Sequence, residues 1–113
     1  MSLDLSCYCA EPAAMIAEII VSLRVARGDL FVNSHILNDP ESLSEPTAWN
    51  EAEKKIASGF GIAAKSSIYI LVDDDHAEQV QEIADAIYDS LGPGKVVVTL
   101  QTDHLIPYRG SKT

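Results

Sequence analysis

Acidic side chains concentrate between residues 73 and 89, a segment that contains neither Lys nor Arg. The seven acids are Asp73, Asp74, Asp75, Glu78, Glu82, Asp85 and Asp89. From Asp75 onward they step by three, four, three and four residues, which on a helix places them within an arc of about 80°. Apolar side chains occupy the opposite arc: Val80, Ile83, Ala84, Ile87 and Leu91. The spacing predicts an amphipathic helix with a continuous row of carboxylates on its exposed face.

Such a row destabilises the helix that carries it. Its four neighbouring like-charge pairs cost about 0.2–0.5 kcal/mol each at low salt, or about 1–2 kcal/mol together. A basic surface on a partner protein would relieve this repulsion and speed encounter through long-range attraction. We therefore predict that the seven acids bind a basic protein partner, with Tyr88 beside them as an exposed aromatic contact. The alternative is a solvated helix face without a binding role.

The first three acids also suggest a different chemistry. Asp73, Asp74 and Asp75 follow an apolar strand and precede His76, and oxygen ligands at a strand end suit Mg²⁺ or Ca²⁺. The chain has no Gly-rich phosphate loop, and an Asp at a helix start is more often a cap. We predict no metal site. A small ligand- or Mg-binding α/β enzyme or regulatory domain using Asp73–His76 remains the alternative function.

The other reactive residue types do not form a recognisable site. Cys7 and Cys9 alternate on one face of an expected strand, without the paired spacing that zinc ligands need, so we expect buried and inert thiols. No Gly-x-Ser-x-Gly elbow is present. The sequence predicts no catalytic residue, no cofactor and no enzymatic activity.

The overall charge excludes several partner classes. Eight Lys and Arg against 17 Asp and Glu give a net charge of −9, which disfavours nucleic acid and an anionic membrane surface. The most apolar stretch, residues 13–26, contains Glu18 and Arg24 and is too short to span a bilayer. The first residues lack the basic segment of a secretory signal, so a cytoplasmic protein is expected.

Alternating periodicities of two and about 3.6 predict strands and helices in βαβαβαβ order. The expected strands are 3–9, 30–37, 67–72 and 95–101, and the expected helices are 12–27, 46–58 and 75–91. Residues 1–101 would form a single α/β domain and residues 102–113 an irregular tail. We predict a two-layer or three-layer domain with a mainly parallel or mixed four-stranded sheet. A split ferredoxin-like arrangement is the alternative.

The same patterns predict which segments are buried. Strand 3–9 reads as an edge strand, and strand 67–72 as a central strand covered on both faces. Helix 12–27 is expected to be largely buried, because Met15, Val21 and Val25 widen its apolar stripe. The helix after Pro46 would be capped by Ser44 or Glu45, with Trp49 as a core anchor.

Residues Ile68–Val98, an apolar strand, an acidic cluster, an amphipathic helix and Val-Val-Val, resemble the opening of bacterial response-regulator receiver domains. The resemblance implies a role for the acidic cluster like that in receiver domains, where it helps to hold Mg²⁺ beside a phosphoacceptor Asp on a later strand. Only fifteen residues follow Val98, and they cannot supply the later strands of a receiver. We interpret the similarity as shared local physics.

The leading functional prediction is a bacterial immunity or antitoxin protein that neutralises a basic, nuclease-type toxin by covering its active surface. Barstar-like inhibitors are similar in small size, acidity and α/β character. A homo-oligomeric scaffold is a third possibility, and the sequence does not determine the oligomeric state.

Overall fold

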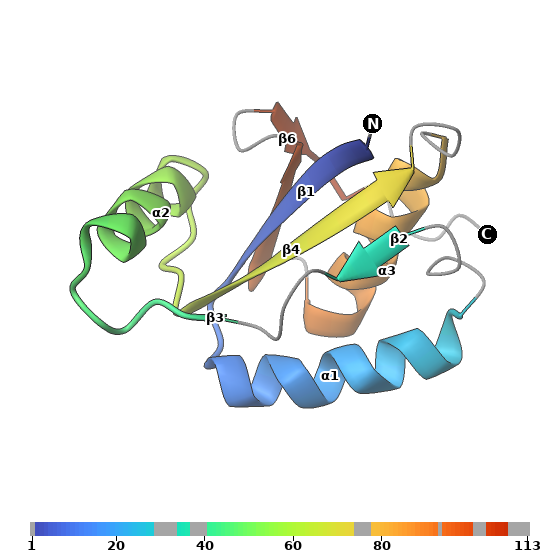
Figure 1. Ribbon diagram of the computed structural model, residues 1–113, viewed down its shortest axis with the longest axis horizontal. Helices are drawn as coiled ribbons and strands as arrows, with labels where there is room; N and C mark the ends of the chain where they lie inside the picture. The colour runs from blue at the N-terminus through green and yellow to red at the C-terminus, as the bar shows by residue number, and fades with distance from the viewer. Residues whose placement is uncertain are drawn as a thin grey trace.

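The computed structural model describes residues 2–28, 34–36, 41–73, 78–92, 94–100 and 104–108. The elements in these residues are, in chain order, β1 (Ser2–Cys9), α1 (Ala13–Ala26), β2 (Ser34–Ile36), β3 (Glu41–Ser42), α2 (Ala48–Gly59), β4 (Ser66–Asp73), α3 (Val80–Leu91), β5 (Val96–Leu100) and β6 (His104–Ile106) (Figure 1).

The six strands form one sheet in the spatial order β2-β4-β1-β5-β6, and β3 pairs with β4 beyond the end of β2. Every pairing is antiparallel. The prediction of a mainly parallel or mixed four-stranded sheet in βαβαβαβ order is therefore wrong. Two short strands were also missed, since β3 lies between the expected strand 30–37 and the expected helix 46–58, and β6 lies in the expected irregular tail.

The error arose because a helix between two strands determines their relative direction but not whether they are neighbours in the sheet. β1 and β2 both run antiparallel to β4, so they share one direction, and β4 lies between them. In the same way β4 and β5 share one direction with β1 between them. The alternation of strands and helices thus predicted that the two strands joined by a helix run in the same direction. It did not predict that an antiparallel strand lies between them in the sheet. This is the split arrangement considered as the alternative, and it also removes the receiver-like parallel pairing of residues 68–98.

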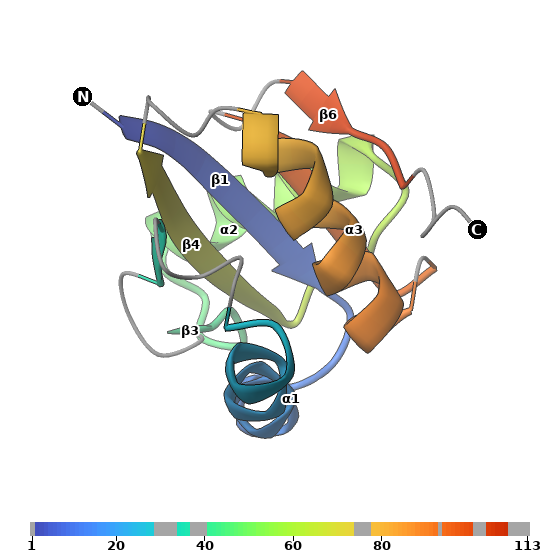
Figure 2. The same cartoon turned by 90° about the vertical axis from the view of Figure 1, so that its right-hand side faces the viewer.

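The sheet lies between two unequal helical layers. α1 and α3 cover one face, and α2 lies on the other (Figure 2). The main core joins α1 and α3 to the side chains of Leu5, Cys7, Cys9, Ile68, Ile70, Val72, Val96, Val98 and Ile106. A smaller core beneath α2 contains Tyr8, Leu43, Ala57, Ile62, Ala64 and Val97.

The position of β1 differs from expectation, whereas that of β4 agrees with it. β1 pairs with both β4 and β5, so the prediction of an edge strand is wrong. Ser6 and Tyr8, whose side chains alternate with those of Cys7 and Cys9 along the strand, are also buried. β4 is a central strand, as its continuous apolar run predicted.

Helix α1 is less buried than its composition predicts. Only Ile16, Ile20 and Leu23 are buried. Val21 and Val25 are 64% and 82% exposed, and Met15 is 46% exposed. The expectation of a largely buried helix is therefore wrong, because α1 contacts the molecule along one narrow stripe and presents apolar side chains to solvent.

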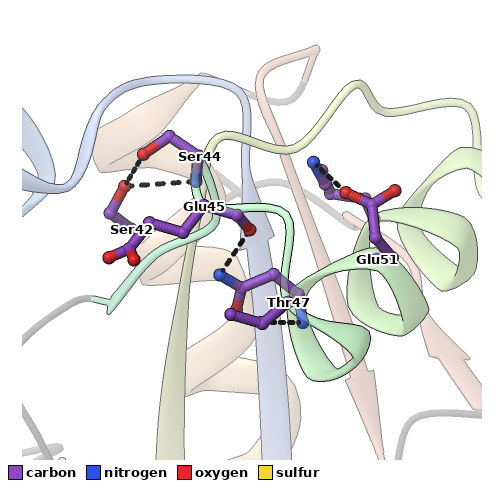
Figure 3. Close-up of polar contacts among 7 residues, drawn as sticks. Ser42, Ser44, Glu45, Thr47 and Glu51 are labelled. Atoms are coloured by element: carbon purple, nitrogen blue, oxygen red, sulfur yellow. Dashed lines mark hydrogen bonds and ion pairs between the residues drawn. The ribbon is translucent and has the colours of Figure 1, made fainter.

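Helix α2 begins later than expected and turns its only tryptophan outward. Thr47 is the N-cap, and its hydroxyl accepts a hydrogen bond of 3.1 Å from the backbone N–H of Asn50 (Figure 3). The Asn50 side-chain amide donates to the carbonyl oxygen of Glu45 at 3.0 Å. Neither Ser44 nor Glu45 caps the helix. Trp49 is 64% exposed, so its assignment as a core anchor is wrong.

Candidate functional site

Helix α3 carries the predicted carboxylates on its outer side. Ile83, Ala84, Ile87 and Leu91 are buried against the sheet, which leaves the opposite side to solvent. Glu78, Glu82 and Asp89 are exposed, and Asp85 is half-buried. We call these four residues the acidic row. The helix begins at Val80, with Gln79 as an N-cap that makes no side-chain cap hydrogen bond, rather than at residue 75. Glu78 lies in the turn that precedes it.

Neutral groups contact Asp85 and Asp89, the C-terminal half of the acidic row. The Gln81 side-chain amide donates to Asp85 at 3.0 Å and to the carbonyl oxygen of Pro107 at 2.9 Å. The hydroxyl of Tyr108 donates a hydrogen bond to Asp89. Within the described part of the chain, no Lys or Arg forms an ion pair with Glu78, Glu82 or Asp89. Their negative charges are therefore not compensated by a neighbouring cation in that part of the molecule.

The remaining predicted acids belong to the segment before α3. Asp73 is the last residue of β4. Asp74 and Asp75 lie outside the described residues, as does His76. No cluster of three or more His, Cys, Asp or Glu suited to a metal ion occurs among the residues that are described. The cation alternative at Asp73–His76 is consequently not tested by the structure.

Tyr88, expected to be an exposed contact, is buried. Its side chain is 4% exposed, and its hydroxyl donates to the carbonyl oxygen of Ile106 at 2.7 Å. The same hydroxyl accepts a hydrogen bond of 3.1 Å from the backbone N–H of Val98. Tyr88 thus attaches β6 and β5 to α3 and is not available as a surface contact.

The sequence interpretation overlooked Tyr108, which is the aromatic residue exposed beside the acidic row. Its side chain is 38% exposed, and its ring packs on that of Tyr88 at a centroid distance of 5.5 Å. It lies in the segment expected to be irregular, where no periodicity could predict its position.

A groove of about 360 Å³ lies between α1 and α3. Its lining residues are Glu18, Ile19, Ser22, Leu23, Ala26 and Ser90. Ser90 follows Asp89, the last member of the acidic row. The groove therefore reaches α3 at the residue that follows the last member of the acidic row in the sequence.

The opposite face of the sheet contains a buried carboxylate under α2. Glu53 is 5% exposed, and its Oε2 atom accepts a hydrogen bond of 3.3 Å from the hydroxyl of Ser67. Burial raises the pKa of the Glu53 carboxyl above its ordinary value, although the Ser67 hydrogen bond acts in the opposite direction. The hydroxyls of Tyr8 and Tyr69 are also buried, without a hydrogen-bond partner in the described structure.

A second cavity, of about 490 Å³, lies near the first residues of α1 and includes Lys54 and Lys65. Lys54 forms an ion pair of 2.8 Å with Glu51. Glu51 therefore compensates the charge of Lys54 locally. Among the helices that the structure describes, none has the length and apolar character needed to cross a membrane.

Comparison with known proteins decides among the functional alternatives. Residues 1–104 match the protein family described as CDI System Immunity Component. The chain belongs to this family. The prediction of an immunity protein that neutralises a toxin is thereby confirmed.

The immunity component also resembles a solved structure. A chain of the CdiA-CT/CdiI toxin and immunity complex from Burkholderia pseudomallei superimposes with a TM-score of 0.79 at 18% sequence identity. The match covers 92% of this chain and 96% of that chain, so the two share a fold over nearly their whole length. A comparison with curated proteins gives no match.

Proposed function

We propose that this immunity component neutralises its toxin by stoichiometric binding, without catalysis, and that the acidic row of α3 contacts a basic surface of the toxin. The observation that carries the proposal is the exposure of Glu78, Glu82 and Asp89 without a cationic partner in the described residues. Asp85 completes the row, and Asp73, Asp74 and Asp75 would extend it by their position in the sequence.

The toxin surface that this row fits is one that binds nucleic acid. A nuclease neutralises phosphates with Lys and Arg, so its substrate site is cationic. Carboxylates spaced along a rigid helix can occupy such a site and exclude the substrate. Attraction between the two surfaces also accelerates association, which matters for a protein that must capture a toxin before it acts. A nuclease-type toxin with a basic active surface is therefore the proposed partner.

Charge reversal in the acidic row tests the proposal. In the variant Glu78→Lys/Glu82→Lys, both altered side chains are exposed, so the fold should persist with unchanged or slightly higher thermal stability. We expect the association rate constant with a non-toxic form of the cognate toxin domain to fall by about tenfold or more at low salt. The dependence of that rate on ionic strength should also weaken.

A matched control carries the same change in net charge elsewhere. Glu45 and Glu51 are exposed near the start of α2, on the opposite side of the sheet. The variant Glu45→Lys/Glu51→Lys should bind with nearly the association rate of the unaltered protein. Equal slowing in the two variants would mean that only total charge matters. Unchanged association in the α3 variant would refute the proposed surface.

A further inference from the structure

Helix α1 exposes an apolar stripe that the fold does not use. Residues 14, 18, 21 and 25 follow helical spacing on its outer side, and all four are exposed. They are Ala14, Glu18, Val21 and Val25, so a single charge interrupts an otherwise apolar stripe. Three of the six large hydrophobic side chains exposed among the described residues, Met15, Val21 and Val25, lie on this helix. We call these three residues the apolar patch.

The groove between α1 and α3 lies between the helix that carries the apolar patch and the helix that carries most of the acidic row. Glu18 and Ser22 line the groove on the α1 side, and Val21 and Val25 are their neighbours along the outer face of the helix. On the α3 side the lining residue is Ser90, directly after Asp89. Figure 2 shows the C-terminal end of α3 approaching α1. Glu18 of α1 therefore lines this shallow, mainly apolar groove, and Asp89 of α3 directly precedes its lining residue Ser90 in the sequence.

We propose that the toxin extends from the acidic row onto α1, where one of its apolar side chains occupies the groove and packs on the apolar patch. This inference rests on the proposed function, because it takes the toxin as the occupant. Interfaces obtain most of their affinity from a few apolar or aromatic anchors, with charged side chains around them. The acidic row alone would govern the rate of encounter, and the groove would govern the lifetime of the complex.

Charge complementarity favours the toxin over a second copy of this chain. A symmetric pairing through α1 and α3 would place the same patch of each copy against the other. The acidic rows, which carry no cationic partner at Glu78, Glu82 and Asp89 in the described residues, would then lie close together and repel. A partner with Lys or Arg around an apolar side chain could pair with the acidic row and pack on the apolar patch at the same time.

The decisive variant removes the apolar patch without altering charge. Val21→Ser/Val25→Ser changes two exposed side chains, so folding should be retained. We expect the dissociation rate constant of the toxin complex to rise by about tenfold or more, with an unchanged association rate and salt dependence. Ala26→Phe, which fills the groove, should have the same effect through a steric block. Trp49→Ser, an equally exposed hydrophobic side chain on the other face of the sheet, is the control and should leave both rates unchanged.

The outcomes separate this inference from the proposed function. If the α1 variants leave dissociation unchanged while Glu78→Lys/Glu82→Lys slows association, the inference fails and the proposed function stands. If dissociation rises in the α1 variants while charge reversal has no effect, the toxin docks on α1 but the role of the acidic row is refuted. If only Trp49→Ser weakens the complex, both are overturned. If the α1 variants convert a dimer of this chain into a monomer without affecting toxin binding, the occupant is a second copy and the inference is overturned.

Discussion

The hydroxyl of Ser67 in the central strand β4 donates a hydrogen bond of 3.3 Å to the carboxylate of Glu53 in α2. Glu53 is thus an ionisable side chain buried between α2 and the sheet, next to the smaller core. Burial raises the pKa of Glu53, the Ser67 hydrogen bond lowers it, and the negative charge of Glu41 raises it again. The net result is a pKa above the ordinary value of 4.5.

This shift makes stability depend on pH in a defined direction. The folded protein binds the Glu53 proton more tightly than the unfolded chain does, so the contribution is favourable at low pH. This stabilising contribution is lost as the pH rises from the ordinary pKa of a Glu carboxyl through the raised pKa of Glu53. Glu53→Gln keeps an acceptor for Ser67 without a charge, so we expect higher stability than the unaltered protein at neutral pH. Urea unfolding from about pH 5 to about pH 8 measures the difference.

Glu51 provides the matched control for that experiment. It is exposed on the same helix and pairs with Lys54 at 2.8 Å. Glu51→Gln should change the free energy of unfolding by less than about 1 kcal/mol at every pH. A Glu53→Gln protein that is less stable than the unaltered one at neutral pH would show that the ionised carboxylate is favourable in the fold.

Tyr88→Phe tests the attachment of β5 and β6 to α3. The substitution leaves the carbonyl oxygen of Ile106 and the N–H of Val98 without the hydroxyl that they share. We expect a loss of about 1–3 kcal/mol in the free energy of unfolding, together with faster hydrogen exchange at Val98. Tyr108→Phe removes an exposed hydroxyl and should cost about 0.5 kcal/mol or less. Similar losses for the two variants would contradict a structural role specific to Tyr88.

The two cysteines should be unreactive in the folded protein. Burial raises the pKa of Cys9 to about 12, and burial together with neighbouring Cys9 raises that of Cys7 well above the ordinary value. Because the thiolate is the reactive form, neither residue should react with a thiol reagent at about pH 8 unless the protein unfolds. Denaturation should release two reactive thiols per chain, which mass spectrometry can count. Rapid labelling of the native protein would show that β1 is accessible.

Trp49 distinguishes the structure sharply from the sequence-based interpretation. A core tryptophan replaced by Ala costs about 3–5 kcal/mol, whereas a surface residue costs within about 0.5 kcal/mol. Since Trp49 is 64% exposed, we expect Trp49→Ala to have the smaller effect. It is the only tryptophan, so quenching of its fluorescence by acrylamide should be nearly as efficient in the native as in the unfolded protein. Strong protection from quenching would place it in the core instead.

These differences show which properties a sequence pattern determines. Apolar periodicity located β1, β4, β5 and α1 because each contributes a continuous buried face. Apolar periodicity could not predict which strands are neighbours in the sheet, because a strand keeps the same face buried whichever strand it pairs with. The exposure of Glu78, Glu82 and Asp89 followed from helical spacing and is confirmed, but their contact with a toxin stays a prediction.

Tyr88 was misplaced although a signal was present. It lies four residues after Ala84 and three before Leu91, and both of these belong to the buried stripe of α3. Helical spacing alone would have assigned Tyr88 to the core. The outward position of Trp49 had no such signal, because its spacing from the buried residues Glu53 and Ala57 is also that of an inward stripe. Only the way α2 sits on the sheet decides its exposure.

The central position of the first strand has a consequence for synthesis on the ribosome. β1 emerges before its partners β4 and β5, which follow more than 50 residues later in the chain. Until those segments are made, the edges of β1 have no native neighbour, and its apolar face depends on α1 or on chaperones for cover. Protection against the toxin should therefore require synthesis through β5, so a translation product that stops before β5 should give none.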